Sequence, residues 1–319
     1  MELNMSKKIA LVFPGQGAQA VGMGKDFYDS DLIASETLKK AFSILGSDYQ
    51  NVCFEGPKET LTQTQYAQPL IFALSAAIYD ELKANGLKPA YVAGHSLGEL
   101  TAYYASGALN LEQSLALIQE RGARMAASHP SDDSAMCAVM GMSGDDLNAV
   151  LSQCNTQPVV AANFNCPGQI VISGVTAAVD EAKAAIKEQG GKCIPLAVSG
   201  AFHSPLMESA SDQLANYTAS MSINDASTAI VLNRTAEAEQ DAEALRANIA
   251  LQVKSSVYWE QTVRYLEQQR VELIIECGPG KVLSKLIQKT CSLDVYNVNS
   301  LESLKALSEQ INLEELCVD

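Results

Sequence analysis

The sequence has little of several features that mark common protein classes. Aromatic residues make up 6% of its 319 residues, and only one tryptophan and three histidines are present. The apolar run near the N-terminus, Ile9 to Phe13, has five residues, which is too few for a signal-peptide core or a membrane span. We therefore expect a cytoplasmic protein with no membrane role.

Basic residues and paired cysteines are also scarce. The chain has 22 Lys and Arg against 37 Asp and Glu, a formal net charge of -15. A field of this sign repels phosphate backbones and anionic lipid, so we expect no nucleic-acid partner. The eight cysteines form no Cys-x-x-Cys pair, which predicts reduced thiols and no metal site.

Apolar runs and helical patterns alternate along most of the chain. Residues 8–13, 90–93 and 271–276 are short apolar runs that predict buried strands, and helical periodicity is seen at 205–221 and across 242–268. Strands that alternate with helices predict an α/β core with a parallel sheet. A hydrophobic content of 47% is enough for a large core.

The middle of the chain has a different rhythm. Strands are predicted at 135–142, 159–163, 169–173 and 193–198, and helices at 143–154 and 176–189. The order β-α-β-β-α-β is that of a ferredoxin-like unit. We therefore expect residues 131–199 to be a small ferredoxin-like subdomain, inserted between the parts 1–130 and 200–319 of a large α/β domain.

One short motif indicates chemistry. Gly94-His95-Ser96-Leu97-Gly98 matches Gly-x-Ser-x-Gly, with an apolar strand before it and a helical pattern after it. This context places a serine on a sharp turn above the end of a parallel sheet, as in hydrolase-like folds. The alternative is a chance Gly-Ser-Gly turn. The context favours a catalytic Ser96 in the large domain.

A serine nucleophile needs a base, and the candidates are few. The side chain of His95 should point away from Ser96, and His129 lies in a polar loop near the expected domain boundary. By elimination His203 is the preferred base, although His129 stays open. Asp212 and Glu276 are acids without a supporting motif, so the sequence favours a Ser-His dyad at least as much as a triad.

A glycine-rich segment near the start and an arginine downstream have alternative interpretations. Gly15-Gln16-Gly17 follows a strand, but Ala20 stands where a dinucleotide-binding motif needs its third glycine, so nucleotide binding is rejected. For Arg121, helical periodicity alone favours an exposed arginine paired with a nearby acid.

Beyond these local patterns, the chain resembles the malonyl-CoA:acyl carrier protein transacylases and the acyltransferase domains of polyketide synthases over nearly its whole length. The resemblance is carried by seven motifs in order: Val12 to Gln19, Gly94 to Glu99, Arg121-Gly122, Asn165 to Gln169, Ala201 to Ser204, Gln252 with Val257 to Trp259, and Glu276 to Lys281.

The resemblance implies roles for the catalytic residues. Ser96 would be the acylated nucleophile and His203 its base. The main-chain carbonyl of Gln252 would orient the imidazole, where a hydrolase uses a carboxylate. Backbone N–H groups of Gln16 and Leu97 would form the oxyanion hole.

The resemblance also implies the substrate contacts. Arg121 would bind the free carboxylate of a malonyl group through two donors, which reverses the interpretation drawn from periodicity. Met125 would lie against the acyl chain, and Asn165 would contact substrate from the small subdomain. Phe202 is similar to the residue found in malonyl-selective members.

The implied activity is transfer of malonyl from malonyl-CoA to the phosphopantetheine thiol of acyl carrier protein, by a ping-pong route that supplies fatty-acid synthesis. Coenzyme A thioester would be the substrate, no cofactor would be bound, and a monomer is expected. Three alternatives stay open: loading of polyketide synthase carrier domains, a serine esterase or thioesterase, and a non-catalytic carrier-binding subunit.

Overall fold

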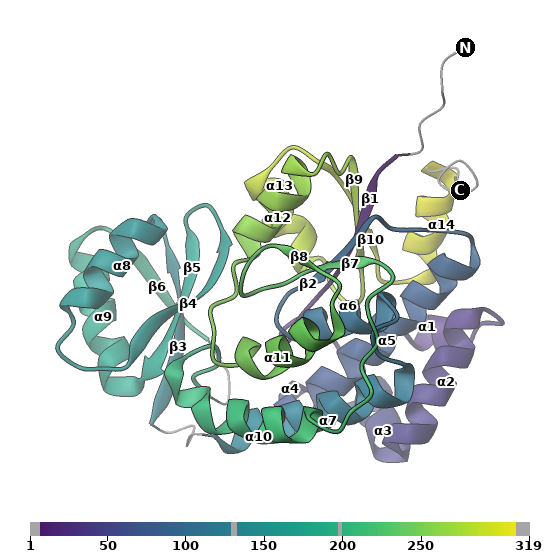
Figure 1. Ribbon diagram of the computed structural model, residues 1–319, viewed down its shortest axis with the longest axis horizontal. Coiled ribbons are helices and arrows are strands. Elements are labelled where there is room, and N and C mark those ends of the chain that lie inside the picture. Colours follow the sequence, from purple (N-terminus) through teal and green to yellow (C-terminus); the bar gives the residue numbers. More distant parts are fainter. Residues whose placement is uncertain (1–6, 129–132, 197–199, 311–319) are drawn as a thin grey trace, which may run out of the picture.

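The protein is built around two β-sheets that lie side by side (Figure 1). The computed structural model describes residues 7–128, 133–196 and 200–310. The larger sheet has six strands in the order β10-β9-β1-β2-β7-β8. They are β1 (Ile9–Phe13), β2 (Tyr91–Gly94), β7 (Ala229–Val231), β8 (Ala238–Glu239), β9 (Leu273–Cys277) and β10 (Asp294–Val298).

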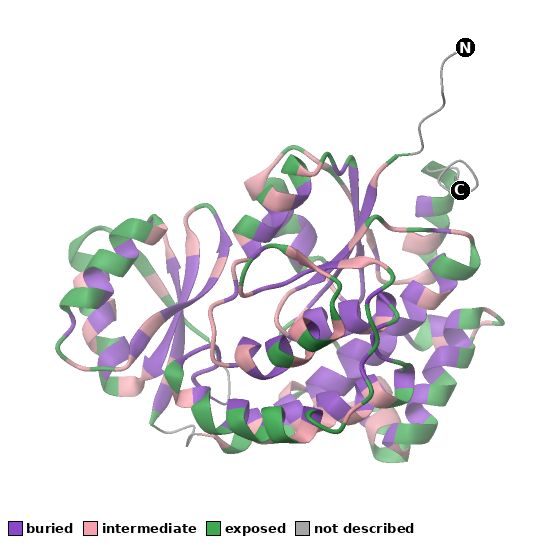
Figure 2. Cartoon of the chain, in the orientation of Figure 1, coloured by how far each residue is buried: buried purple, intermediate pink, exposed green. Residues whose placement is uncertain are grey.

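The larger sheet is mainly parallel. β1 pairs in parallel with β2 and β9, β9 with β10, and β2 with β7, whereas β8 runs antiparallel to β7. Every residue of β1 is buried, because helices cover both faces of the sheet (Figure 2). The expected α/β core with a parallel sheet is therefore confirmed.

Side chains of β1 alternate between two helical layers. Ile9, Leu11 and Phe13 belong to the main hydrophobic cluster, and Ala10 and Val12 belong to a second cluster on the other face. The main cluster is formed with α1 (Lys25–Tyr28), α2 (Ile33–Leu45), α3 (Ser47–Glu55), α4 (Lys58–Thr62), α5 (Thr64–Ala84), α6 (Leu97–Ala105), α7 (Leu111–Ala127), the 3₁₀ turn η1 (Pro205–Met207), α10 (Glu208–Thr218), α11 (Ala242–Gln252) and α14 (Leu301–Gln310). The second cluster is formed with α12 (Trp259–Gln268) and α13 (Val282–Thr290).

The smaller sheet has four antiparallel strands in the order β4-β5-β3-β6. They are β3 (Ser134–Met140), β4 (Val159–Cys166), β5 (Gln169–Val175) and β6 (Lys192–Pro195), and α8 (Gly144–Gln153) and α9 (Thr176–Glu188) pack on the sheet. Cys137 and Val139 face these helices, whereas Met136 and Ala138 face the main cluster. The small sheet is therefore apolar on both faces, and its second face is directed at the rest of the molecule.

Some expectations need correction. The helical region 242–268 is two helices, α11 and α12, and the helix expected over 205–221 is a 3₁₀ turn followed by α10, which ends at Thr218. β10 was not predicted. His129 and the expected boundary residues 131 and 199 lie outside the described residues. In the described parts of the chain, the helices are too short or too polar to cross a lipid bilayer.

Candidate active site

A sharp turn joins β2 to α6 and carries Ser96. Its φ of 52° and ψ of −104° form a conformation that residues other than glycine rarely adopt. Strain of this kind costs on the order of 1–3 kcal/mol and tends to occur at functional sites. A Cβ on Gly94 would lie 2.0 Å from the carbonyl carbon of Gly98, and a Cβ on Gly98 would lie 2.0 Å from the oxygen of Phe13. The close approach of strand and helix therefore requires both glycines.

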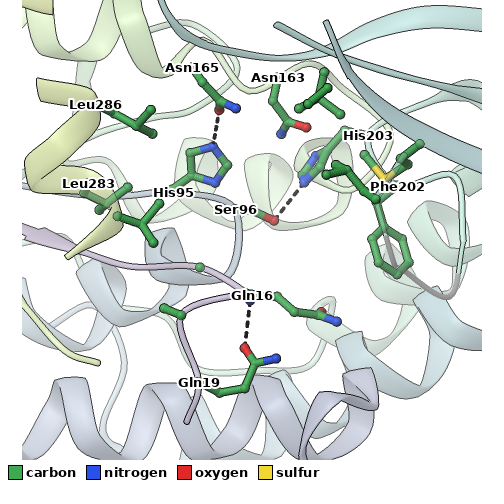
Figure 3. Close-up of a pocket in the computed structure, with 18 of the residues that line it drawn as sticks. Gln16, Gln19, His95, Ser96, Asn163, Asn165, Phe202, His203, Leu283 and Leu286 are labelled. Atoms are coloured by element: carbon green, nitrogen blue, oxygen red, sulfur yellow. Dashed lines mark hydrogen bonds between the residues drawn. The ribbon is translucent and has the colours of Figure 1, made fainter. Parts of the chain in front are cut away.

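Ser96 and His203 meet although they are far apart in the sequence. The Ser96 Oγ lies 2.7 Å from the His203 Nε2 (Figure 3). His203 belongs to the segment before η1, has φ 57°, and is 3% exposed. Its backbone N–H donates to the oxygen of Val253 at 3.0 Å. The structure thus brings together the serine and the histidine that the sequence favoured.

The second ring nitrogen of His203 faces two main-chain carbonyls. Nδ1 lies 3.0 Å from the oxygen of Gln252 and 3.1 Å from the oxygen of Ser255. Because a carbonyl only accepts hydrogen bonds, Nδ1 carries the hydrogen and Nε2 accepts from the Ser96 hydroxyl. Burial, and then the charge of Arg121, lower the pKa of His203 to about 3. The imidazole is therefore neutral near pH 7 and free to take a proton.

Neither acid considered from the sequence contacts His203. Glu276 accepts hydrogen bonds from the backbone N–H groups of Leu283 at 3.0 Å and Ser284 at 2.8 Å, and so caps the start of α13. Asp212 is exposed on α10. Within the described residues the imidazole is held by carbonyl oxygens, which corresponds to a dyad.

Arg121 is buried beside the dyad, with 1% of its surface exposed. Its Nη1 donates to the Gln68 Oε1 at 2.9 Å, and its Nη2 donates to the Gln252 Oε1 at 2.9 Å and to the Ser96 Oγ at 3.1 Å. All three acceptors are neutral, so the exposed, acid-paired arginine favoured by periodicity alone is wrong. Burial lowers the Arg121 pKa to about 10, and the side chain remains a cation near pH 7. The nearby carboxyl group of Glu99 acts in the opposite direction and raises the Arg121 pKa, but it is not a hydrogen-bond partner of the guanidinium. A buried cation whose hydrogen-bond acceptors are all neutral attracts an anion.

The dyad opens into a cavity of about 340 Å³ that lies between the loops following β1 and β2 and the small sheet (Figure 3). This volume is typical of small-ligand sites. Met136, Ala138 and Val171 line the cavity from the small sheet, and Leu283 and Leu286 line it from α13. Of the residues singled out in the sequence, the cavity is lined by Gln16, Ser96, Met125, Asn165, Phe202 and His203, whereas Leu97, Arg121 and Gln252 are buried without lining it.

The two residues expected to stabilise an oxyanion lie at the same end of the larger sheet. Gln16 follows β1 and donates from its side-chain Nε2 to the Thr64 Oγ1 at 3.1 Å. Leu97 is the first residue of α6. The N–H of Leu97 is therefore among the first-turn groups that have no acceptor within the helix, where the helix dipole favours negative charge.

His95 and Asn165 form a separate hydrogen-bonded pair on the wall of the cavity. The His95 Nε2 lies 2.8 Å from the Asn165 Oδ1 (Figure 3), and the imidazole packs edge-on against Trp259 with ring centroids 5.8 Å apart. Burial lowers the pKa of His95. As expected, the His95 side chain is directed away from the Ser96 hydroxyl, and its partner comes from β4.

Three buried polar residues beside the dyad are not among the site residues expected from the sequence. Gln68 on α5 holds Arg121, and Asn233 after β7 accepts from the Ser96 N–H at 2.7 Å. Glu99 accepts from the Asn233 N–H and from the Asn248 Nδ2, and burial raises its pKa to about 7. A charged residue on the apolar pattern of α6 could have singled out Glu99. No local signal identifies the two amides.

Comparison with protein families resolves the identity of this arrangement. Residues 10–313 match the family model of the acyl transferase domain. The chain belongs to the acyl transferase family. It is therefore an acyltransferase, and the elbow serine, the buried histidine and the cavity all lie within the matched region.

Relatives and solved structures are similar over most of their lengths. The malonyl CoA-acyl carrier protein transacylase of Haemophilus influenzae is 39% identical over 95% of this chain and 99% of its own, and that of Bacillus subtilis is 38% identical over 88% and 90%. A malonyl-transacylase solved in complex with a type II PKS acyl-carrier protein has 34% identity and a TM-score of 0.92, covering 95% of this chain and 100% of its own. The acyl-carrier-protein S-malonyltransferase of Burkholderia pseudomallei has 36% identity and a TM-score of 0.91, covering 95% and 99%.

Proposed function

We propose that this acyltransferase moves a malonyl group from malonyl-CoA to the phosphopantetheine thiol of an acyl carrier protein, through a malonyl ester on Ser96, and so supplies fatty-acid synthesis. The observation that carries the proposal is the 2.7 Å contact between the Ser96 Oγ and the His203 Nε2 at a cavity beside a buried arginine. The choice of malonyl and of a carrier protein draws on the names of the relatives.

In the first half-reaction the His203 Nε2 removes the Ser96 hydroxyl proton, and the Oγ attacks the thioester carbonyl of malonyl-CoA. The carbon–sulfur bond then breaks. The proton on Nε2 passes to the leaving thiolate, so coenzyme A departs as a thiol. The carbonyl of Gln252, 3.0 Å from Nδ1, favours the imidazolium that exists between these two transfers.

In the second half-reaction the carrier's thiol gives its proton to the His203 Nε2, and the thiolate attacks the ester. The bond from the acyl carbon to the Ser96 Oγ breaks, and the Oγ recovers the proton. The N–H groups of Gln16 and Leu97 would stabilise the oxyanion formed in each half. The position of Leu97 at the start of α6 supports this role.

Arg121 would select for a dicarboxylic acyl group. Its two donating nitrogens are 2.9–3.1 Å from neutral acceptors, one of them the Ser96 Oγ itself. A carboxylate is a stronger acceptor than a neutral amide oxygen, so the free carboxylate of malonyl would replace at least one of them. Met125, Asn165 and Phe202 would contact the acyl group and its thioester, which is supported by their place on the cavity lining.

The same dyad could serve another carrier. A similar structure contains a malonyl-transacylase bound to a type II PKS acyl-carrier protein, so loading of a polyketide carrier is the second candidate. We infer a cytoplasmic enzyme whose coenzyme A thioester is a substrate. In the proposed cycle, every proton transfer and bond change involves only residues of this chain, the thioester and the thiol of the carrier, so no step needs a bound cofactor.

We also propose that residues 131–199 act as a ferredoxin-like small subdomain inserted into a hydrolase-like large domain, 1–130 and 200–319. The order β3-α8-β4-β5-α9-β6 and the antiparallel strand order β4-β5-β3-β6 support this division. So does the separate hydrophobic cluster between that sheet and its helices.

The proposal is tested by following a malonyl group through both half-reactions. The protein is incubated with malonyl-CoA, and peptide mass spectrometry should find the malonyl adduct on Ser96. Addition of phosphopantetheinylated carrier from either pathway should then discharge it. Ser96→Ala should lose at least about 10³-fold in transfer rate, while Ser106→Ala, another buried serine near α6, should transfer normally. Steady release of free malonate without an acceptor thiol would instead indicate a thioesterase.

A further inference from the structure

Asn233 contacts both the turn that carries Ser96 and the segment that follows the carbonyl groups at His203. It lies just beyond β7 and is 0% exposed. β7 runs parallel to β2, with Val231 opposite Ala93. Because parallel neighbours end at the same edge of a sheet, the residues that follow β7 lie beside the turn that carries Ser96.

The side chain of Asn233 joins the two sides of that turn. Its Oδ1 accepts from the Ser96 N–H at 2.7 Å, and its Nδ2 donates to the Gly94 oxygen at 2.6 Å. The oxygen of Ser96 is held separately by the Gln252 Nε2 at 2.8 Å. Buried side-chain amides thus fix both the N–H and the oxygen of Ser96, whose φ is 52°. A strained backbone conformation of this kind persists only when surrounding contacts hold it.

The backbone of Asn233 reaches the segment that holds the base. Its N–H donates to Glu99 on α6, and its oxygen accepts from the Tyr258 N–H at 2.8 Å. Tyr258 follows closely after Ser255, whose oxygen lies 3.1 Å from the His203 Nδ1. One residue therefore contacts the nucleophile through its side chain and the base-holding segment through its main chain.

We propose that Asn233 is a positioning residue that holds the Ser96 Oγ in register with the His203 Nε2. The inference rests on the proposed function, because it concerns the rate at which this serine is acylated. A displacement of about 1 Å in a reacting group can lower a rate by about 100-fold. Asn233 contacts only main-chain atoms of Ser96, so its loss should slow the chemical step and leave substrate affinity unchanged.

The test compares Asn233→Ala with Asn248→Ala. Asn248 is equally buried, at 1% exposed, and donates to the same Glu99 at 2.7 Å, but it does not contact Ser96. For each variant we would measure kcat and KM for malonyl-CoA, the rate at which a fluorophosphonate probe labels Ser96, and the melting temperature. Asn233→Ala should lower kcat and the labelling rate together by about 10- to 100-fold, with the KM within about twofold, whereas Asn248→Ala should change both rates by less than about threefold.

A second variant covers the case in which Asn233→Ala does not fold. Asn233→Asp keeps an oxygen that can accept from the Ser96 N–H and replaces the amide that donates to Gly94, so its rates should fall between those of the parent and the alanine variant. Unchanged kcat in the Asn233 variants, or an equal fall in the Asn248 variant, would overturn the inference. If the probe and malonyl-CoA leave Ser96 of the parent unmodified, the proposed function fails instead, and the two failures are distinguishable.

Discussion

The two sides of the catalytic cavity are built in different ways. On the side of the parallel sheet, the turn at Ser96 is held by backbone contacts so tight that a Cβ on either neighbouring glycine would lie 2.0 Å from main-chain atoms. On the opposite side, the four-stranded sheet presents apolar side chains from β3 and β5, beside the polar side chains of Asn163 and Asn165 on β4. Met136 and Val171 are buried there, and Leu196 at the rim is 37% exposed.

This difference separates two tasks. The parallel-sheet side fixes the positions of the reacting atoms, where close packing leaves no room for adjustment. The small-sheet side sets the space that is available to the acyl group, and apolar walls tolerate changes of volume better than polar networks tolerate the loss of a partner. Substitutions on the first side should therefore act on kcat, on folding and, at Arg121, on the need for a charged acyl group, whereas those on the second side should act on the size of the acyl group that is accepted.

The largest effect is expected at Gly98. In Gly98→Ala the new methyl group would lie 2.0 Å from the oxygen of Phe13 in the fully buried β1, so unfolding free energy should fall by at least about 3 kcal/mol and transfer should be lost. Urea denaturation and a malonyl-transfer assay measure both. Gly122→Ala is the matched control: its methyl group would lie 3.5 Å from the nearest atom, the oxygen of Thr64, which is an ordinary van der Waals distance, and stability should rise by about 0.5–1 kcal/mol. A Gly98→Ala protein that folds and transfers normally would contradict the comparison.

Arg121→Ala should have the next largest effect, and it should depend on the substrate. Loss of the buried cation removes the partner of the malonyl carboxylate, so kcat/KM for malonyl-CoA should fall about 100-fold, which corresponds to about 3 kcal/mol. Acetyl-CoA has no free carboxylate, so its transfer should fall much less. The ratio of malonyl to acetyl transfer is the measurement. Arg124→Ala, one turn along the same helix and hydrogen-bonded to Gln213, should leave the ratio unchanged. An equal loss on both substrates in Arg121→Ala would remove the assigned role.

A smaller effect is expected in the pH dependence. Protonation of His203 removes the base, so activity should fall as the pH drops through its pKa, which burial and Arg121 lower from 6.5 to about 3. Acetyl transfer should therefore show no acid limb near pH 6.5. In Arg121→Ala the positive charge that lowers the His203 pKa is absent. The His203 pKa should therefore rise, and the loss of activity in acid should begin at a higher pH.

The same profile is measured alongside Glu99→Gln, because burial raises the pKa of Glu99 to about 7 and its titration would fall in the same range. An acid limb at pH 6.5 that persists in both the parent and Glu99→Gln would mean that the imidazole is not held in the buried, neutral state described above.

How far the fold could be predicted from the sequence depends on burial. β1 was predictable because a parallel strand covered on both faces is a continuous apolar run. β10 was not, because four of its five residues are at least partly exposed and its sequence carries no clear pattern. β7 has only three residues, which is too short for an apolar run to indicate a strand. Local periodicity therefore identified the centre of the sheet and missed its periphery.

The same distinction applies to the site. Ser96 was predictable because its turn needs two glycines at fixed spacing. Apart from the family resemblance, His203 was reached by elimination among three histidines, since helical or strand periodicity does not mark the loop that carries it. The burial of Arg121 and the contacts of Asn233 depend on elements far away in the sequence, so no local signal could reveal them. Family resemblance, rather than periodicity, supplied the expectation for Arg121.

The smallest effect is expected on the wall formed by the small sheet. Met136 and Met142 are similarly buried, at 6% and 7% exposed, but Met136 lines the cavity and Met142 packs under the helices of that sheet. Met136→Ala and Met142→Ala should each lose about 2 kcal/mol of stability.

Only Met136→Ala enlarges the cavity, so only it should raise the rate for methylmalonyl-CoA relative to malonyl-CoA, on the order of 1 kcal/mol or severalfold. In both variants kcat for malonyl should stay within about threefold of the parent, because neither side chain supplies a reacting group or holds one in place. An equal shift in selectivity would mean that loosening of the sheet, rather than room for the substrate, is responsible. A collapse of kcat in Met136→Ala alone would place part of the chemistry on this wall and end the division of tasks between the two sides.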